Sequence, residues 1–166
     1  MDPAKREIRL LHLAPSENID DQPKCFLKNI SLNDNPQYEA LSYAWGDVKV
    51  TQPINLQDVQ REITENLEAA LRQLRGNIME KVFWVDAVCI DQNSDEGKNY
   101  QVPLMRTIYS SAAMVRVWLG AGREGSDIAM LVLEKLCRGN PPRFANLRID
   151  GKPLLFAYKR LGWPAG

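Results

Sequence analysis

The residues best suited to chemistry gather where an apolar run gives way to polar side chains. Residues 82–85 are an unbroken series of strand-forming residues, as expected for a strand that is buried on both faces. Asp86, Cys89, Asp91 and Gln92 follow directly after it. Ligands collect at the carboxyl ends of strands in open α/β sheets, so we predict a site at this point of the chain.

Asp86 and Cys89 each allow two interpretations. A carboxylate beside an apolar run is costly to bury without partners, so Asp86 either accepts hydrogen bonds from a neighbouring loop or belongs to a site. Cys89 has no Lys, Arg or His close in the sequence that would lower its pKa. This favours a buried, small apolar residue over a nucleophile.

A second stretch, residues 38–47, mixes aromatic, small and polar residues at close spacing. One interpretation is a strand with alternating faces that ends at Gly46. The other is that Ser42, Trp45 and Asp47 rim a pocket, because a glycine at a strand end lets backbone and side chains approach a ligand. Spacing alone does not decide between them.

Other kinds of site find little support. The chain has no glycine-rich phosphate loop, and it has no HExxH or GxSxG signature. His12 is the single histidine, and it lies in a strand-like run with no identifiable nucleophile nearby. Cys25, Cys89 and Cys137 are far apart and in no CxxC spacing, so we expect reduced thiols, with neither a disulfide framework nor a metal site.

Length and charge narrow the class of protein. The 166 residues, 45% of them hydrophobic, predict a single domain with a substantial core. The 21 basic and 21 acidic residues cancel, which argues against nucleic acid as a partner. No window approaches the roughly 18 apolar residues of a membrane span, and the start lacks a signal-peptide pattern. We therefore expect a soluble, cytoplasmic protein.

The elements that would position these residues predict an α/β fold. Residues 82–85 and 114–119 are expected to be parallel strands of a βαβ unit. Their connection should hold a loop over 91–98 and a helix that starts between Asn99 and Val102, because Pro103 is tolerated only in a first turn. The remaining predicted elements are strands at 8–13 and 25–32 that pair antiparallel, a hairpin of 51–56 and 59–63, a helix capped by Thr64, and helices at 126–138 and 153–161.

Five blocks of the chain closely resemble the heterokaryon incompatibility (HET) domain of filamentous fungi. They occur in the order typical of the family, at residues 38–47, 63–71, 83–92, 101–105 with 108–109, and 117–120. The resemblance covers roughly residues 8–120. It implies one HET-type domain over residues 1–166, with a variable C-terminal segment at 139–166 whose truncation the resemblance leaves open.

This resemblance also implies a function. HET domains act in the cytoplasm as effectors that trigger programmed cell death when genetically different hyphae fuse, by self-association or by binding other death-signalling proteins. The family is remotely similar to TIR domains, which implies a parallel, flavodoxin-like core behind the N-terminal antiparallel strands. Because some TIR domains cleave NAD, one alternative to the effector is an NAD glycohydrolase, with NAD as substrate. A second alternative is a non-catalytic interaction scaffold.

The resemblance suggests roles for individual residues. For an NAD glycohydrolase, the catalytic candidates are Glu96 and Asp86, which would stabilise an oxocarbenium-like transition state, while Trp45 would stack on a ring. Two positions depart from the family pattern: Asp91 replaces the usual asparagine, and Gly97 precedes Lys98 where the family has an acid, which here is displaced to Glu96. The ligand-binding candidates are Ser42, Tyr43, Trp45, Gly46, Asp47, Cys89, Asp91 and Gln92.

Overall fold

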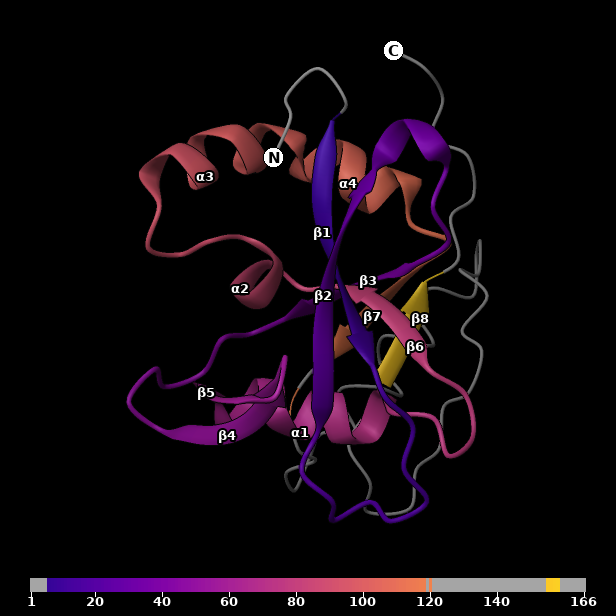
Figure 1. Cartoon of the computed structure of the whole chain (residues 1–166), viewed down its shortest axis with the longest axis vertical. Coiled ribbons are helices and arrows are strands. Elements are labelled where there is room, and N and C mark those ends of the chain that lie inside the picture. Colours follow the sequence, from indigo (N-terminus) through magenta and orange to yellow (C-terminus); the bar gives the residue numbers. More distant parts are fainter. Residues whose placement is uncertain (1–5, 119, 121–154, 159–166) are drawn as a thin grey trace, which may run out of the picture.

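The computed structural model of the chain describes residues 6–118, 120 and 155–158. They form an α/β fold with one mixed β-sheet and several short helices (Figure 1). The strands follow the spatial order β5-β4-β2-β1-β6-β3-β7-β8. Their bounds are β1 Glu7–Leu13, β2 Lys24–Ser31, β3 Glu39–Tyr43, β4 Thr51–Leu56, β5 Val59–Thr64, β6 Lys81–Trp84, β7 Met114–Trp118 and β8 Leu155–Tyr158. The helices are η2 Leu32–Asp34, α1 Glu65–Leu74, α2 Asp86–Cys89, α3 Asp95–Gln101, η3 Val102–Leu104 and α4 Met105–Ser111.

Three parallel strands form the part of the sheet that matters for the site. β3 lies between β6 and β7 and pairs in parallel with both. The predicted parallel arrangement of 82–85 and 114–119 is therefore confirmed, with β3 inserted between them. All three strands end at the same edge of the sheet, since parallel strands run in one direction.

The N-terminal half also folds as the alternation of its residues predicts. β1 pairs antiparallel with β2 over its whole length, and β4 pairs antiparallel with β5. Gln57 and Asp58 turn the β4–β5 hairpin with positive φ angles of 55° and 62°, the conformation of a tight turn whose twist matches that of the strands. β1 also pairs antiparallel with β6 and so joins the two halves of the sheet.

Two sequence-based predictions about helices are wrong. The loop expected over 91–98 ends early, because Ser94 caps α3 by accepting a hydrogen bond from the Gly97 backbone N–H at 3.0 Å. Pro103 does not delay the helix; it lies in the 3-10 turn η3 between α3 and α4. The helix predicted at 153–161 is wrong over Leu155–Tyr158, which form β8 against β7. The helix predicted at 126–138 lies outside the described residues.

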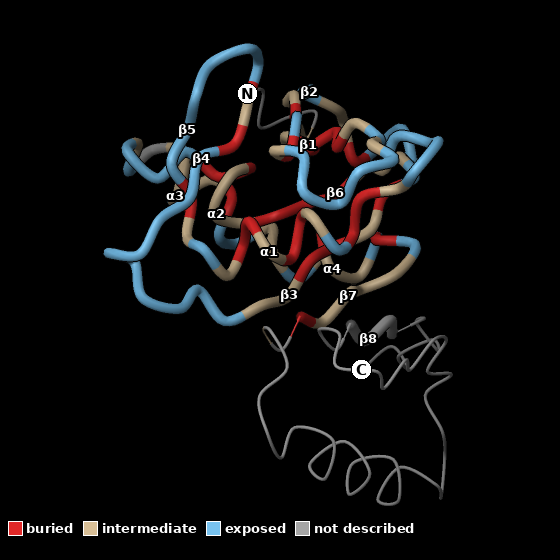
Figure 2. Tube along the Cα trace, turned by 90° about the horizontal axis from the view of Figure 1, so that it is seen from below, coloured by how far each residue is buried: buried red, intermediate tan, exposed pale blue. Residues whose placement is uncertain are grey.

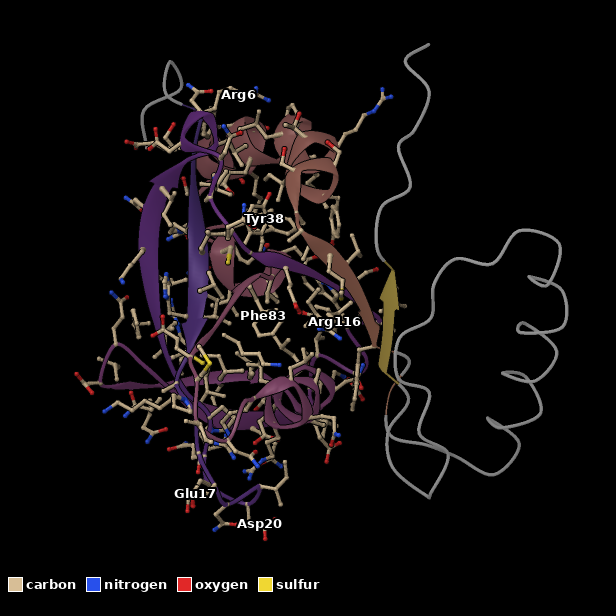
Figure 3. The ribbon with its side chains drawn as sticks, turned by 90° about the vertical axis from the view of Figure 1, so that its right-hand side faces the viewer. Arg6, Glu17, Asp20, Tyr38, Phe83 and Arg116 are labelled. Atoms are coloured by element: carbon tan, nitrogen blue, oxygen red, sulfur yellow. The ribbon has the colours of Figure 1, made fainter. Side chains whose placement is uncertain are left out.

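The core is one cluster of buried side chains to which β1, β3, β6, α1 and α4 all contribute. Its largest fully buried side chains include Trp84, Trp118, Phe83, Leu10, Leu71 and Ile108. Figure 2 shows these buried segments inside the molecule, with an exposed β4–β5 hairpin beside them. Figure 3 shows Phe83 in the interior and Arg116 on β7. No helix among the described residues is long and apolar enough to cross a membrane.

An ion pair ties β3 to β7 beside this core. The Arg116 guanidinium donates from Nε to Glu39 Oε2 at 2.6 Å and from Nη2 to Glu39 Oε1 at 2.9 Å. Both side chains are largely shielded from solvent. This two-pronged geometry is the strong form of an arginine–carboxylate pair, and it fixes the register of the two strands that lead to the site.

Candidate functional site

Two stretches that are far apart in the sequence meet at the carboxyl edge of the parallel strands. Trp45 follows β3, and its indole Nε1 donates a hydrogen bond to Asp86 Oδ2 at 3.2 Å. The other carboxylate oxygen of Asp86 accepts from the Ala87 backbone N–H at 2.7 Å. Asp86 is half-buried, while Trp45 remains 41% exposed. The edge therefore presents an aromatic face next to a carboxylate.

Two tyrosines lie behind Asp86. Burial raises the pKa of Tyr109 to about 12, and the negative charge of Asp86 adds to this increase. The pKa of Tyr43 is raised for the same reasons, with burial the larger cause. Tyr109 donates to the Leu41 carbonyl at 3.1 Å, whereas the buried Tyr43 hydroxyl has no hydrogen-bond partner within the described part of the chain. Both phenols therefore stay protonated at neutral pH and supply donors rather than charge.

Asn66, in the first turn of α1, organises this edge. Its side-chain amide donates to the Ala44 carbonyl at 2.6 Å, and its Oδ1 accepts from the Trp118 indole Nε1 at 2.8 Å. One side chain thus joins the end of β3 to the end of β7. Asn66 was not among the predicted site residues, because an asparagine in the first turn of a helix is usually an ordinary surface residue. Its position in the second HET-like block was the available signal.

Two glycines let the backbone pass close to Asn66. Gly46 has φ +76° and Gly120 has φ +99°, conformations that L side chains rarely adopt. A Cβ at either position would lie 3.5 Å from the Asn66 side chain, which is ordinary contact. The glycines are therefore required by backbone conformation rather than by lack of space. Gly46 in particular turns the chain immediately after Trp45.

Several predicted site residues do not point into this edge. Cys89 is fully buried; its sulfur accepts from the Val85 N–H at 3.4 Å, and burial raises the pKa of its thiol to about 12. Asp47 accepts from the Lys49 backbone N–H at 2.9 Å and so stabilises its own exposed turn. Ser42 is half-buried on β3, opposite Val117. Cys89 is therefore a buried thiol that packs in the core and cannot contact a ligand at the surface.

The remaining candidates lie further along the chain. Asp91 and Gln92 are exposed and line a separate pocket, although the Gln92 side chain still donates to the Asp86 carbonyl at 3.1 Å. Glu96 lies in α3, and its side chain is outside what the structure describes. His12 is buried, stacks on Phe26 and contacts Glu80 through Nδ1 at 2.6 Å. Over the described ranges, no three His, Cys, Asp or Glu side chains converge as metal ligands would.

Comparison with known proteins shows to which family this chain is related. Residues 38–148 match the family described as heterokaryon incompatibility protein (HET). The chain belongs to the HET family. It is 35% identical over 142 residues to heterokaryon incompatibility protein 6, OR allele, of Neurospora crassa. That alignment covers 78% of this chain but only 21% of the relative, and no solved structure matches the chain significantly.

Family membership confirms the resemblance seen in the sequence blocks. The matched region contains Trp45, Asn66, Asp86 and Gly120, which are the residues that meet at the carboxyl edge. The HET match therefore spans all three parallel strands together with the side chains that join their ends.

We predict that Asn66→Ala will destabilise this HET domain measurably. The substitution leaves the Trp118 indole N–H without an acceptor at a side chain that is only 1% exposed, and it removes the donor to Ala44. A buried donor without a partner costs about 1–3 kcal/mol, so we expect the free energy of unfolding in urea to fall by that order. Ala44 is exposed, so water replaces the donor that its carbonyl loses.

Asn99→Ala serves as the matched control, because Asn99 is an exposed residue on α3. This control should change the free energy of unfolding by no more than about 0.5 kcal/mol. Equal stability of the two variants would show that Asn66 does not hold the strand ends together.

Proposed function

We propose that this HET domain is an effector of fungal non-self recognition that triggers programmed cell death in the cytoplasm. The observation that carries the proposal is the family match over residues 38–148, supported by a relative whose name states heterokaryon incompatibility. The chain spans about a fifth of the length of that relative. We therefore propose, by similarity, that this domain has the activity of the longer protein.

The effector acts through self-association or through binding other death-signalling proteins. The loop after β3 supports this mode, because it exposes Trp45, Val48 and Val50 at 41%, 61% and 45%. Tryptophan is enriched among residues that dominate binding energy, and neighbouring exposed apolar residues are typical of interaction surfaces. The Asp86 hydrogen bond holds the Trp45 ring in a fixed orientation, which lowers the entropy lost on binding.

We propose further that residues 1–166 form one HET-type domain whose core is TIR-like. Support comes from the three parallel strands β6, β3 and β7 and from the helical connection between β6 and β7. The antiparallel pairs β1–β2 and β4–β5, which are joined by a parallel contact between β2 and β4, then form an addition on the β6 side of that core.

Induced expression of the 166-residue chain in a filamentous fungus should arrest growth and admit a membrane-impermeant dye. Trp45→Ala removes the exposed ring and should reduce the dye-positive fraction severalfold at equal protein level. Val59→Ala is the matched control, because Val59 is 65% exposed but lies on β5 at the far side of the sheet. Normal growth of a host that accumulates the folded wild-type chain would contradict the effector proposal.

One observation favours a second candidate, an NAD glycohydrolase. The half-buried Asp86 carboxylate lies beside an exposed indole at the carboxyl edge, where a ribose and a stacked ring could be held. In this reaction the bond between nicotinamide and ribose C1 breaks, and water adds at C1 with release of a proton. The negative charge of Asp86 would stabilise the oxocarbenium-like transition state.

Nicotinamide release from NAD by the purified, concentrated domain tests this candidate. Asp86→Asn keeps the acceptor for the Trp45 indole but removes the charge, so release should fall by about a hundredfold or more if the carboxylate supplies the main electrostatic stabilisation. A wild-type chain that kills cells yet releases no nicotinamide at any concentration would exclude the enzyme and leave the effector proposal standing.

A further inference from the structure

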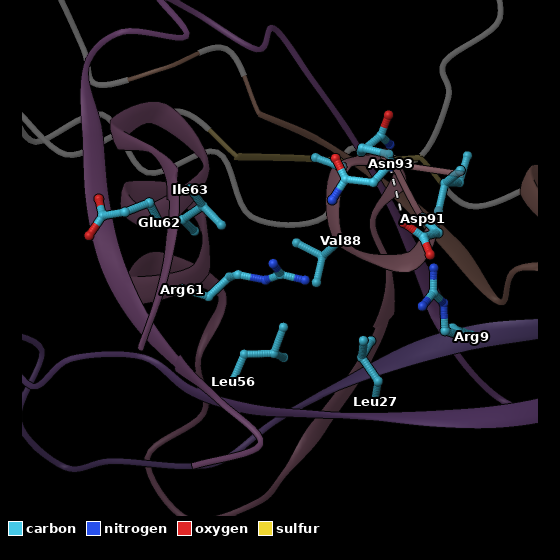
Figure 4. A pocket seen from close by; sticks show the side chains of 12 residues that line it. Arg9, Leu27, Leu56, Arg61, Glu62, Ile63, Val88, Asp91 and Asn93 are labelled. Atoms are coloured by element: carbon cyan, nitrogen blue, oxygen red, sulfur yellow. Dashed lines mark hydrogen bonds between the residues drawn. The ribbon is translucent and has the colours of Figure 1, made fainter. Parts of the chain in front are cut away.

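A pocket of about 260 Å³ lies apart from the Trp45–Asp86 edge. Its walls come from the β4–β5 hairpin on one side and from α2 with the following loop on the other, and β1 and β2 contribute side chains (Figure 4). Leu27, Leu56 and Val88 supply apolar surface, while Gln92 and Asn93 supply amides. The pocket is therefore partly apolar and partly polar, as binding sites for small organic molecules are.

Two arginines line this pocket from different walls. Arg9, on β1, donates from Nε to the Cys89 carbonyl at 2.7 Å, which fixes the plane of its guanidinium. The Nη2 group of Arg9 is buried and has no hydrogen-bond partner among the residues that the structure describes. Arg61, on β5, extends toward Val88 in Figure 4. Within the described part of the chain, the Arg61 guanidinium makes no hydrogen bond or ion pair, so it is free to bind an anion.

The acidic residues at the pocket do not neutralise both arginines. Side chains alternate along a strand, so Arg61 shares a face with the buried Ile63 while Glu62 faces the other way. Figure 4 shows the Glu62 carboxylate directed away from the other lining side chains. Among the residues that line the pocket, Asp91 is the other carboxylate, and its Oδ1 accepts from the Asn93 backbone N–H at 3.1 Å. Two guanidinium groups thus face a single carboxylate.

We propose that this pocket binds a small phosphate monoester. The phosphate dianion would lie between the side chains of Arg61 and Arg9, with the exposed Arg61 as the accessible donor, while the organic part contacts Leu27 and Leu56. Guanidinium groups suit phosphate because their planar N–H donors match its oxygens. The volume of about 260 Å³ is smaller than the range of typical ligand pockets, which favours a compact molecule over a dinucleotide. This site is independent of the proposed effector and glycohydrolase roles.

Calorimetric titration of the full 166-residue chain with phenyl phosphate tests the proposal, because this probe combines a dianion with an apolar ring. We expect saturable binding that is tighter than binding of inorganic phosphate. Arg61→Gln should weaken it about tenfold, since a hydrogen bond to a charged group is worth that much or more. Arg61 is exposed, so this variant should fold normally.

Neighbouring carboxylates provide the controls. Asp91→Asn removes a negative charge from the pocket and should strengthen binding of phenyl phosphate severalfold. Glu62→Gln removes a negative charge one residue from Arg61 but on the opposite face of β5, and it should change the affinity by less than about twofold because solvent screens an exposed charge.

Three results would overturn the proposal. One is no saturable binding of phenyl phosphate by the wild-type chain. Another is equal affinity of the wild type and Arg61→Gln, which would place the anion elsewhere. The third is binding of a phosphoserine tripeptide without binding of phenyl phosphate, which would assign the pocket to a modified protein segment instead of a small molecule.

Discussion

Asn66 is the constraint on which the carboxyl edge depends. Parallel strands β3 and β7 pair from Glu39 to Tyr43 and from Met114 to Trp118. The Asn66 side chain adds a link at their carboxyl ends by donating to Ala44 and accepting from Trp118. Because Trp118 is buried, its indole N–H needs an acceptor inside the protein, and this need fixes α1 against both strands. The orientation of Trp45 follows from this arrangement.

The molecule then carries two polar surfaces with different chemistry on either side of α2. At the start of α2, Asp86 is half-buried and holds Trp45. Burial raises the pKa values of Tyr43 and Tyr109, and the charge of Asp86 adds to this increase, so this surface combines one carboxylate with neutral donors. After the end of α2, Asp91 and Gln92 border a pocket that faces two arginines. Cys89 lies between the surfaces but is sealed in the core, and its peptide carbonyl, not its thiol, contacts Arg9. A single turn of helix therefore separates an acidic edge from a basic pocket.

Sequence patterns predicted the elements that depend on local rules. Alternation and apolar runs located the first seven strands, and the Gln57–Asp58 turn was placed correctly because its geometry is set by neighbouring residues. The start of α3 was missed, because the Ser94 cap outweighed the expected effects of Gly97 and Pro103. β8 was missed because Leu155–Tyr158 are held by pairing with β7, which is a distant contact. Trp45 and Asp86 meet because β3 pairs with β6, a neighbour that sequence patterns did not predict, and Asn66, Arg9 and Arg61 likewise enter only through packing in three dimensions.

Amide hydrogen exchange of wild type and Trp118→Phe tests most directly whether the bridge through Asn66 organises the edge. The substitution removes the indole N–H that binds Asn66, together with part of the ring volume, while it retains an aromatic side chain in the core. If Asn66 organises the edge, protection will fall at residues 41–43, at the carboxyl end of the β3–β7 pairing, and at the start of α1, while the Gln57–Asp58 turn keeps its wild-type exchange. Unchanged protection at residues 41–43 in the folded variant would contradict this.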